Sequence, residues 1–400
     1  MNDLLHEYEG RLGRTFFDHQ RGFLQAWLEL ELQRACLYFP TGKGKTLTAL
    51  AALGLRGLTQ ALVVTPPVQG PVWQAEGAKL GIDVTTISHA KFRQKDYRLD
   101  RKVPLIVDEF HLLGGAQGMG WKKLDRAARG YLAPLLILSA TPQYNDAERV
   151  YCVEHVLDPL SPNVRDGLLG FIYRNCETEQ NNFGMMPLVK GFLKWPNAKN
   201  GAEEYLKALP SVFHIPDEAI YQIVDIPVMT KVPDEFDTFG LDMRSERIMA
   251  SQMEAKHRLL DLQLIGDDGA LWPHVADELE HLIGIADTPV LVFCAFERIA
   301  EAFARTMDQL NTRYALVTGS TPAKQKLKLI QMFRQGEFDV LVGTATLATG
   351  TDGLDRMCNT MILLNDTDDG ALRRQLVGRI LPRGKNADYS KKKFWRIQPC

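Results

Sequence analysis

A glycine- and lysine-rich loop, PTGKGKT at positions 40–46, constrains the fold of this 400-residue chain more than any other feature. The apolar run CLYF precedes it and the helix-compatible run LTALAALGL follows it, which predicts a strand, a phosphate-binding loop and a helix in that order. The glycines let backbone amides turn toward phosphate, Lys45 supplies a positive charge for the β and γ oxygens, and Thr46 offers a hydroxyl to magnesium. The residues expected to bind a nucleoside triphosphate here are Thr41, Gly42, Lys43, Gly44, Lys45 and Thr46. A glycine-rich turn before a surface helix is the alternative interpretation.

Short apolar runs alternate with helix-compatible stretches on both sides of this loop. The runs ACLYF, ALVVT, LIVDE and LLILS form one series, and PVLVFCAF, ALVTG, DVLVGTAT and MILLN form a second. Buried parallel strands have this character, so we predict an α/β fold with two similar parallel-sheet domains. The expected domains are residues 1–158 and 217–400, with a mostly helical insertion at 159–216, where the alternation fades.

Two acids end the predicted strand in LIVDEFH, at the edge of an open α/β sheet where ligands bind. We expect Asp108 to hold magnesium together with Thr46, and Glu109 to orient and deprotonate an attacking water. A carboxylate pair that only caps the next helix is the alternative. The phosphate loop about sixty residues earlier favours the catalytic interpretation.

Composition limits the other classes of protein. The six cysteines lie far apart without zinc-ligand spacing, and no apolar run approaches the ~20 residues that span a bilayer. We expect a cytoplasmic protein with reduced thiols. The net charge of −2 provides no global basic field, so nucleic acid would be bound by local patches. The basic run at 391–393 is expected to be a solvated terminus.

These motifs resemble, in order along the chain, those of the superfamily 2 helicases. DEFH is similar to a DExH box, and SATP at 139–142 is similar to the motif that links hydrolysis to movement. The resemblance implies two RecA-like domains with ATP hydrolysed in the cleft between them. It also implies that His111, Ser139 and Thr141 couple the ATP state to nucleic-acid binding.

Two further segments of the first half resemble the same family. FFDHQRGFLQAWL at 16–28 is similar to the segment whose glutamine reads adenine, which implies that Gln20 is the base contact. The start of an amphipathic helix is the alternative for this segment. TPPVQGPVWQAEGAKLG at 65–81 is similar to motif Ia, which implies that Thr65 and Pro66 contact the nucleic-acid backbone.

The second half resembles motifs V and VI. GTATLATGTDGLD at 343–355 implies that Gly350 and Asp352 bind nucleotide, and QLVGRILPRG at 375–384 implies catalytic roles for Gln375, Arg379 and Arg383. An arginine is suited to this place because its planar, permanent charge stabilises the γ-phosphoryl oxygens. The family pattern QxxGRxxR puts its second arginine at position 382, whereas here Arg383 stands one residue later. An arginine-bearing surface helix is the alternative.

The resemblance is closest to Swi/Snf-type DNA translocases and small phage or bacterial repair helicases, which implies a bacterial or phage-infected cell as the source of this cytoplasmic protein. It implies an ATP hydrolase that acts as a DNA helicase or double-stranded DNA translocase, gripping the backbone without sequence specificity. An RNA helicase of the same superfamily is one alternative, and an ATP-switched binding module without strand separation is another. A phosphate-loop kinase or GTPase would leave the motifs of the second half unexplained.

Overall fold

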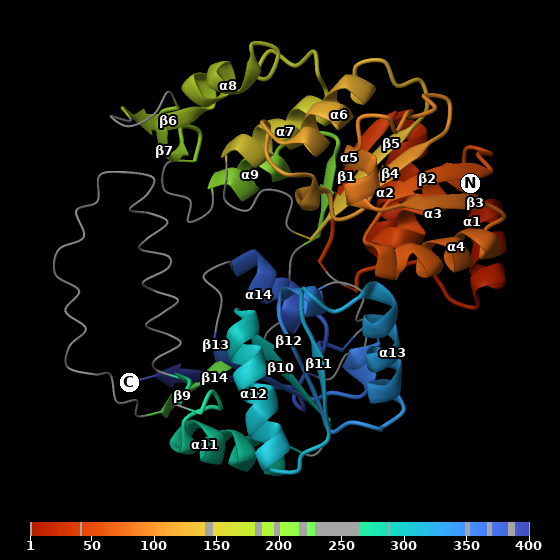
Figure 1. Cartoon of the computed structure of the whole chain (residues 1–400). Helices are drawn as coiled ribbons and strands as arrows, with labels where there is room; N and C mark the ends of the chain where they lie inside the picture. The colour runs from red at the N-terminus through yellow and green to blue at the C-terminus, as the bar shows by residue number, and fades with distance from the viewer. Residues whose placement is uncertain are drawn as a thin grey trace. The chain divides into compact units, whose positions relative to one another are not determined.

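The structure, a computed structural model, comprises two compact units, residues Met1–Asp217 and Glu218–Cys400, each drawn in Figure 1. The residues that it describes are 2–40, 42–140, 147–180, 186–195, 201–215, 222–228, 264–266, 268–286, 289–348, 353–365, 370–382 and 389–399. Each unit contains a sheet of parallel strands with helices against it, which confirms the predicted α/β fold with two RecA-like sheets. No helix among these residues has the length and apolar character needed to cross a membrane.

The first unit has a six-stranded sheet in the order β3-β2-β4-β5-β1-β8, in which every neighbouring pair is parallel. Its strands are β1 (Arg34–Tyr38), β2 (Gln60–Val64), β3 (Asp83–Ile87), β4 (Leu105–Val107), β5 (Leu135–Ser139) and β8 (Val212–His214). The middle of the sheet is apolar on both faces, which is why these strands read as continuous hydrophobic runs in the sequence.

Helices cover both faces of this first sheet. They are α1 (Asn2–Leu12), α2 (Asp18–Glu29), α3 (Lys45–Gly54), α4 (Gly70–Lys79), α5 (His89–Arg93), α6 (Met119–Ala128) and α7 (Ala147–Leu157). Buried side chains of α1 to α4 pack with Leu37 and Val63, whereas those of α5 to α7 pack with Val64 and Val107. Because successive strand residues point to opposite faces, each strand supplies both cores.

The described residues of the region 159–216, which the sequence predicts to be a mostly helical insertion, form two helices and three short strands. They are α8 (Gly167–Asn175), β6 (Cys176–Glu179), β7 (Leu188–Phe192), α9 (Gly201–Lys207) and β8. β6 and β7 form an antiparallel hairpin, and β8 joins the edge of the first sheet beside β1. The region therefore belongs to the same compact unit as the phosphate loop.

A buried carboxylate fastens this region to α7. Glu154 accepts hydrogen bonds from the Ser161 hydroxyl (2.7 Å), the Asn163 amide (3.1 Å) and the Tyr205 hydroxyl (2.7 Å). The Tyr205 hydroxyl also accepts from Asn163 (2.9 Å), and burial raises the pKa of Tyr205. Three donors satisfy a charge that would otherwise be costly to bury.

Replacing Tyr205 with phenylalanine is expected to lower the free energy of unfolding of the first unit by about 1–3 kcal/mol, because Glu154 loses a donor in a site that water does not reach. Urea denaturation followed by tryptophan fluorescence measures this change. Tyr173→Phe is the control, since the Tyr173 side chain is mostly exposed and should change stability by less than about 0.5 kcal/mol. Equal effects of the two variants would contradict the role given to the Glu154 network.

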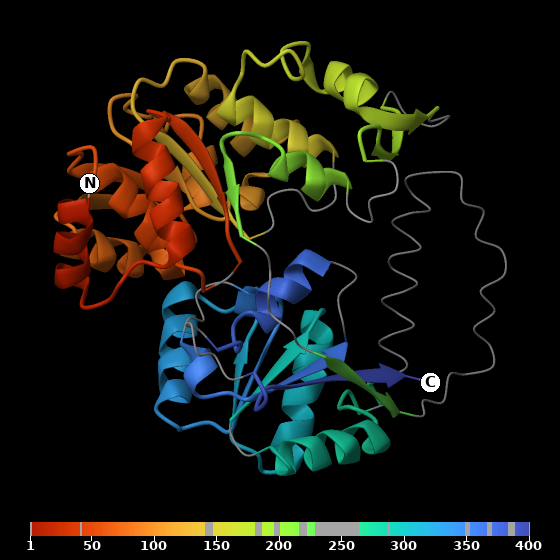
Figure 2. The same cartoon turned by 180° about the vertical axis from the view of Figure 1, so that it is seen from behind.

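The second unit has another six-stranded parallel sheet, in the order β11-β12-β10-β13-β14-β9. Its strands are β9 (Ile223–Val228), β10 (Val290–Cys294), β11 (Tyr314–Val317), β12 (Val340–Gly343), β13 (Thr360–Asn365) and β14 (Lys393–Pro399), and its main helices are α11 (Pro273–Gly284), α12 (Glu297–Gln309), α13 (Ala323–Arg334) and α14 (Gly370–Val377). Buried residues of α11 and α12 pack on one face of the sheet, and those of α13 and α14 pack on the other. Figure 2 shows this unit from behind. The basic run at 391–393 leads into β14 and is only partly a solvated terminus: the Lys392 ammonium donates to the carbonyl oxygens of Asp355 and Cys358.

Candidate nucleotide-binding site

The phosphate loop lies between the carboxyl end of β1 and the start of α3, as the sequence predicts. Gly42 and Gly44 have φ angles of 81° and 77°, a left-handed conformation that glycine adopts without steric cost. The Lys45 ammonium donates to the carbonyl oxygen of Phe39 at 2.9 Å, and Thr46 is half-buried in the first turn of α3. Thr41 lies outside the described residues.

Gln20 holds the end of this loop through its side-chain amide. Its Nε2 atom donates to the Gly44 carbonyl (3.2 Å) and the Thr48 hydroxyl (2.8 Å), while its Oε1 atom accepts from the Phe17 amide (2.8 Å). His19 contacts the Lys43 carbonyl through Nε2 at 3.0 Å. The start of α2 therefore braces the loop, and the adenine contact of Gln20 stays a prediction.

Asp108 follows β4, and its backbone amide donates to the Val64 carbonyl of β2 (2.8 Å). Its Oδ1 atom accepts from the Glu109 amide (3.0 Å), and its Oδ2 atom accepts from the Thr65 hydroxyl (2.9 Å) and the Trp73 indole (3.1 Å). Burial is the main cause that raises the pKa of Asp108 to about 6, and the Glu109 charge adds to it, whereas Lys45 opposes it. The influence of Lys45 links this carboxylate with the phosphate loop.

Glu109 is a buried acid in a strained backbone conformation, with φ of 47° and ψ of 52°. Left-handed conformations in residues other than glycine are costly and cluster at functional sites. Within the part of the chain that the structure describes, the Glu109 Oε2 atom is buried without a hydrogen-bond partner, and His111 Nδ1 lies 3.5 Å from it. A carboxylate oxygen with spare acceptor capacity fits the expected role as a base toward water.

His111 and Ser139 are brought together at the ends of neighbouring strands, with 2.9 Å between Nδ1 and the hydroxyl oxygen. Arg149 of α7 donates to the His111 carbonyl at 2.7 Å. This contact joins the DEFH and SATP segments physically, although their coupling role stays a prediction. Thr141 lies outside the described residues.

Thr65 and Pro66 are buried in this structure, and the Thr65 hydroxyl donates a hydrogen bond to the Asp108 carboxylate. Their predicted contact with a nucleic-acid backbone therefore stays a prediction, and the Thr65 side chain has a partner inside the first unit.

In the second unit, Gln375 lies on α14 and Arg379 follows this helix, and both side chains are buried. Arg379 donates through Nε to the Ala348 carbonyl (2.8 Å), and Lys326 of α13 donates to the Thr346 carbonyl in the same short turn. Burial and the nearby Arg379 lower the pKa of Lys326 to about 8. Gly350, Asp352 and Arg383 lie outside the described residues.

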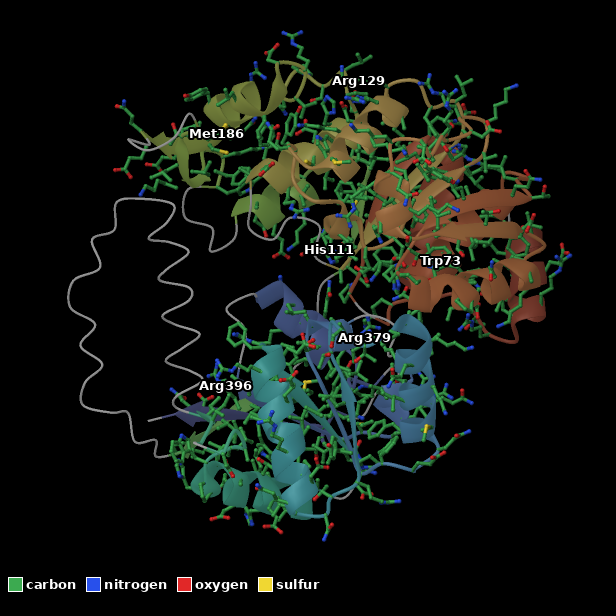
Figure 3. The ribbon with its side chains drawn as sticks, viewed as in Figure 1. Trp73, His111, Arg129, Met186, Arg379 and Arg396 are labelled. Atoms are coloured by element: carbon green, nitrogen blue, oxygen red, sulfur yellow. The ribbon has the colours of Figure 1, made fainter. Side chains whose placement is uncertain are left out.

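Sequence reasoning did not single out three of these residues: Trp73, His89 and Lys326. Trp73 reaches the Asp108 side chain from α4, and His89 Nε2 lies 2.8 Å from the Asp108 carbonyl oxygen. Figure 3 labels Trp73, His111 and Arg379 on their separate elements. Sequence spacing carries no signal for these contacts, because they arise where elements distant in the sequence pack together.

Comparison with known proteins finds a family match in the second half of the chain. Residues 275–383 match the family described as the helicase conserved C-terminal domain. The range contains the predicted residues Gly350, Asp352, Gln375, Arg379 and Arg383.

Curated proteins that are similar to parts of this chain are named as helicases. A protein of Shewanella amazonensis named ATP-dependent RNA helicase RhlB is 28% identical over 192 residues, which are 47% of this chain and 39% of the relative. A protein of the same name from Shewanella frigidimarina is 32% identical over 105 residues, 26% of this chain and 20% of the relative. The chain therefore spans well under half the length of these relatives.

Two solved structures align with most of the chain. S. cerevisiae Dbp5 bound to Gle1 and IP6 matches 99% of this chain and 86% of its own, with a TM-score of 0.54 and 14% identity. The Sulfolobus solfataricus SWI2/SNF2 ATPase core in complex with dsDNA matches 96% of this chain and 88% of its own, with a TM-score of 0.41 and 14% identity. Residues 275–383 of the second unit thus match a helicase C-terminal domain, and the similarity to Dbp5 concerns the fold of the chain.

Proposed function

We propose that this chain is a nucleic-acid-dependent ATPase that uses ATP hydrolysis to move along or remodel nucleic acid. The observation that carries the proposal is the arrangement in the first unit: a braced phosphate loop and two buried acids stand at the carboxyl ends of parallel strands. The helicase C-terminal domain of the second unit supports a motor over a small-molecule kinase or a GTPase.

The donors in the first unit fit ATP and magnesium. A Cβ atom at Gly44 would collide with the Gln20 side chain, so the loop requires glycine at this position. Carboxylate and hydroxyl oxygens such as those of Asp108 and Thr46 are the ligands that magnesium prefers. Magnesium, when bound, neutralises developing charge on the phosphates. Lys45 would exchange the Phe39 carbonyl for phosphate oxygens, and Glu109 would accept the proton of the attacking water.

Replacing Gly44 with alanine is expected to weaken ATP binding by about tenfold or more, since the left-handed conformation costs an alanine ~1–2 kcal/mol. The added Cβ would also lie 2.4 Å from Gln20 Nε2, so the loop must move and withdraw its amides. Titration with a fluorescent ATP analogue measures the affinity. Gly57→Ala is the matched control: it has φ of 71° but no atom within 4 Å of the added Cβ, so it should lose stability and keep affinity.

On the basis of the resemblance to helicases, we further propose that Arg379 is the arginine that stabilises the transferred phosphoryl group. Arg379→Ala is expected to reduce kcat by roughly 10³-fold or more while nucleotide affinity changes little. Arg379→Lys should not restore turnover, because an ammonium lacks the planar fork of the guanidinium. Steady-state ATPase and nucleotide titration separate the two parameters.

Arg374→Ala, on the helix α14 that precedes Arg379, is the control, since the Arg374 side chain is only partly buried and has no proposed catalytic role. Thermal melting establishes that the Arg379 variants are folded. Weak nucleotide binding with normal turnover in Arg379→Ala would rule out the proposed role.

The nucleic acid that we favour is RNA, because the curated relatives are named RNA helicases. DNA is kept as the second candidate, since the segments at 18–28, 139–159 and 208–210 resemble those of double-stranded DNA translocases. The expectation of DNA ahead of RNA thus rests on local motifs alone.

One experiment tests both the proposed motor activity and the kind of nucleic acid on which it acts. ATPase activity is measured without nucleic acid and with single- and double-stranded RNA and DNA of the same sequence and length. Stimulation by RNA above DNA is the expected result, and stimulation by DNA alone would favour DNA, the second candidate.

Basal turnover that no polymer stimulates would overturn the proposed motor activity and favour a kinase, whereas nucleotide binding without any turnover would favour an ATP-switched binding module. Displacement of a triplex strand but not of a duplex strand would identify a translocase.

A further inference from the structure

The Asp108 carboxylate is held on one side by two side chains from elements that carry no phosphate-loop residue. Its Oδ2 atom accepts from the Thr65 hydroxyl at 2.9 Å and from the Trp73 indole nitrogen at 3.1 Å. Asp108, Thr65 and Trp73 are 3%, 1% and 0% exposed, so water does not compete for these contacts. Buried hydrogen bonds to a charged acceptor are among the strongest in proteins.

Sheet register places Thr65 beside Asp108. Val64 of β2 is paired with Val107 of β4, and the next residue of each strand is Thr65 and Asp108. Both therefore emerge at the same carboxyl edge of the sheet, which explains a contact between residues 43 positions apart in the sequence.

Close packing of α4 places Trp73 there. A Cβ atom at Gly77 would lie 2.4 Å from Val84 Cγ2 and 2.8 Å from the Ile82 carbonyl oxygen, so only glycine lets the helix approach β3 this closely. Trp73 lies one turn earlier on this helix, with its ring fully buried. The indole has a single polar hydrogen, and it is directed at Asp108.

The two oxygens of Asp108 consequently differ. Oδ2 accepts two side-chain hydrogen bonds, whereas Oδ1 accepts one from the Glu109 amide. Both side-chain donors act on the same oxygen, which fixes the plane of the carboxylate before any metal arrives. Contacts of this kind, behind a metal ligand, orient it and commonly change metal affinity when they are removed.

We infer that Trp73 and Thr65 are positioning residues for the magnesium-binding carboxylate of Asp108. The inference rests on the proposed function, because it takes Asp108 as the metal ligand of an ATPase. It gives Thr65 a role inside the first unit, whereas the contact with the nucleic-acid backbone that the sequence resemblance implies stays a prediction.

Metal affinity in the full chain tests the inference directly. Binding of Mn²⁺ is measured by electron paramagnetic resonance with a non-hydrolysable ATP analogue present, and affinity for the analogue is measured separately in EDTA. Trp73→Phe keeps an aromatic ring and removes only the donor, so we expect its Mn²⁺ Kd to rise about 10-fold or more. Affinity for the analogue in EDTA should stay within about twofold, because the phosphate loop is unchanged.

Trp27→Phe is the matched control. Trp27 is also 0% exposed in the first unit, but its indole nitrogen donates to the Ala52 carbonyl at 2.9 Å. This variant loses the same chemical group from an equally buried place, so its Mn²⁺ Kd should stay at the wild-type value. A similar rise in both variants would assign the effect to general loss of packing and overturn the inference.

A second pair of variants covers the case in which Trp73→Phe does not fold. Thr65→Val removes the hydroxyl at nearly constant volume and should raise the Mn²⁺ Kd, whereas Thr65→Ser restores a donor and should return it toward wild type. Unchanged Mn²⁺ affinity in folded Trp73→Phe or in Thr65→Val, with normal wild-type binding, would overturn the inference and leave the ATPase proposal standing. A wild-type chain that binds the analogue but no Mn²⁺ would overturn both.

Discussion

Replacing Glu109 with glutamine is expected to reduce ATP turnover by roughly 10²- to 10⁴-fold while nucleotide binding is kept, because an amide of the same shape cannot accept the proton of the attacking water. The structure sharpens this expectation. The Glu109 Oε2 atom is buried and, among the described residues, has no hydrogen-bond partner, so the carboxylate is available for a water that enters with the substrate. Single-turnover hydrolysis and titration with a fluorescent ATP analogue measure the two effects separately.

Glu76→Gln is the control for Glu109. Glu76 lies on α4 in the same unit, where it pairs with Arg14 and Lys79 at the surface, so its loss should leave turnover unchanged. Normal steady-state turnover in Glu109→Gln would remove Glu109 as the base and return the acid pair to a structural role.

Replacing Lys45 with alanine is expected to weaken ATP binding by about 100-fold or more, because hydrogen bonds to charged groups contribute ~1.5–3 kcal/mol each and Lys45 is expected to serve both terminal phosphates. In the structure the ammonium donates to the carbonyls of Phe39 and Pro40, within reach of the loop that it would serve. The variant should therefore melt close to the wild type without nucleotide but lose the rise in Tm that ATP produces.

Lys122→Ala is the control for Lys45, since Lys122 is exposed on α6 far along the chain from the loop. It should keep the full ATP-dependent rise in Tm. An equal rise in Lys45→Ala would show that the loop binds phosphate without its lysine, or that ATP binds elsewhere.

The predicted fold class was recovered because its signals are local. The continuous apolar runs correspond to β1, β2, β4 and β5 in the first unit and to β10 to β13 in the second, where strands are buried on both faces. The strands of region 159–216 gave weaker signals, because β6 and β7 are largely exposed and lack an apolar run. Such strands form by tertiary context rather than by pattern.

The candidate site was only partly predictable, because its motifs are local in the sequence whereas the contacts that support them are not. Gln20, Lys45, Asp108 and Glu109 belong to short motifs whose residue types follow from phosphate and magnesium chemistry. Their supporting contacts, such as Gln20 with Gly44 and His111 with Ser139, join residues 24 and 28 positions apart. No local pattern encodes a contact over that separation.

By itself the sequence determined the strand, loop and helix around PTGKGKT and the two acids after β4, because glycine conformation and apolar periodicity act within a few residues. Only the tertiary structure decided what stands behind those acids. The register of β2 with β4 turned Thr65 toward Asp108, and the close approach of α4 to β3 at Gly77 brought the Trp73 indole to the same oxygen. Such contacts depend on packing between elements that are distant in the sequence, and no local sequence pattern indicates that packing.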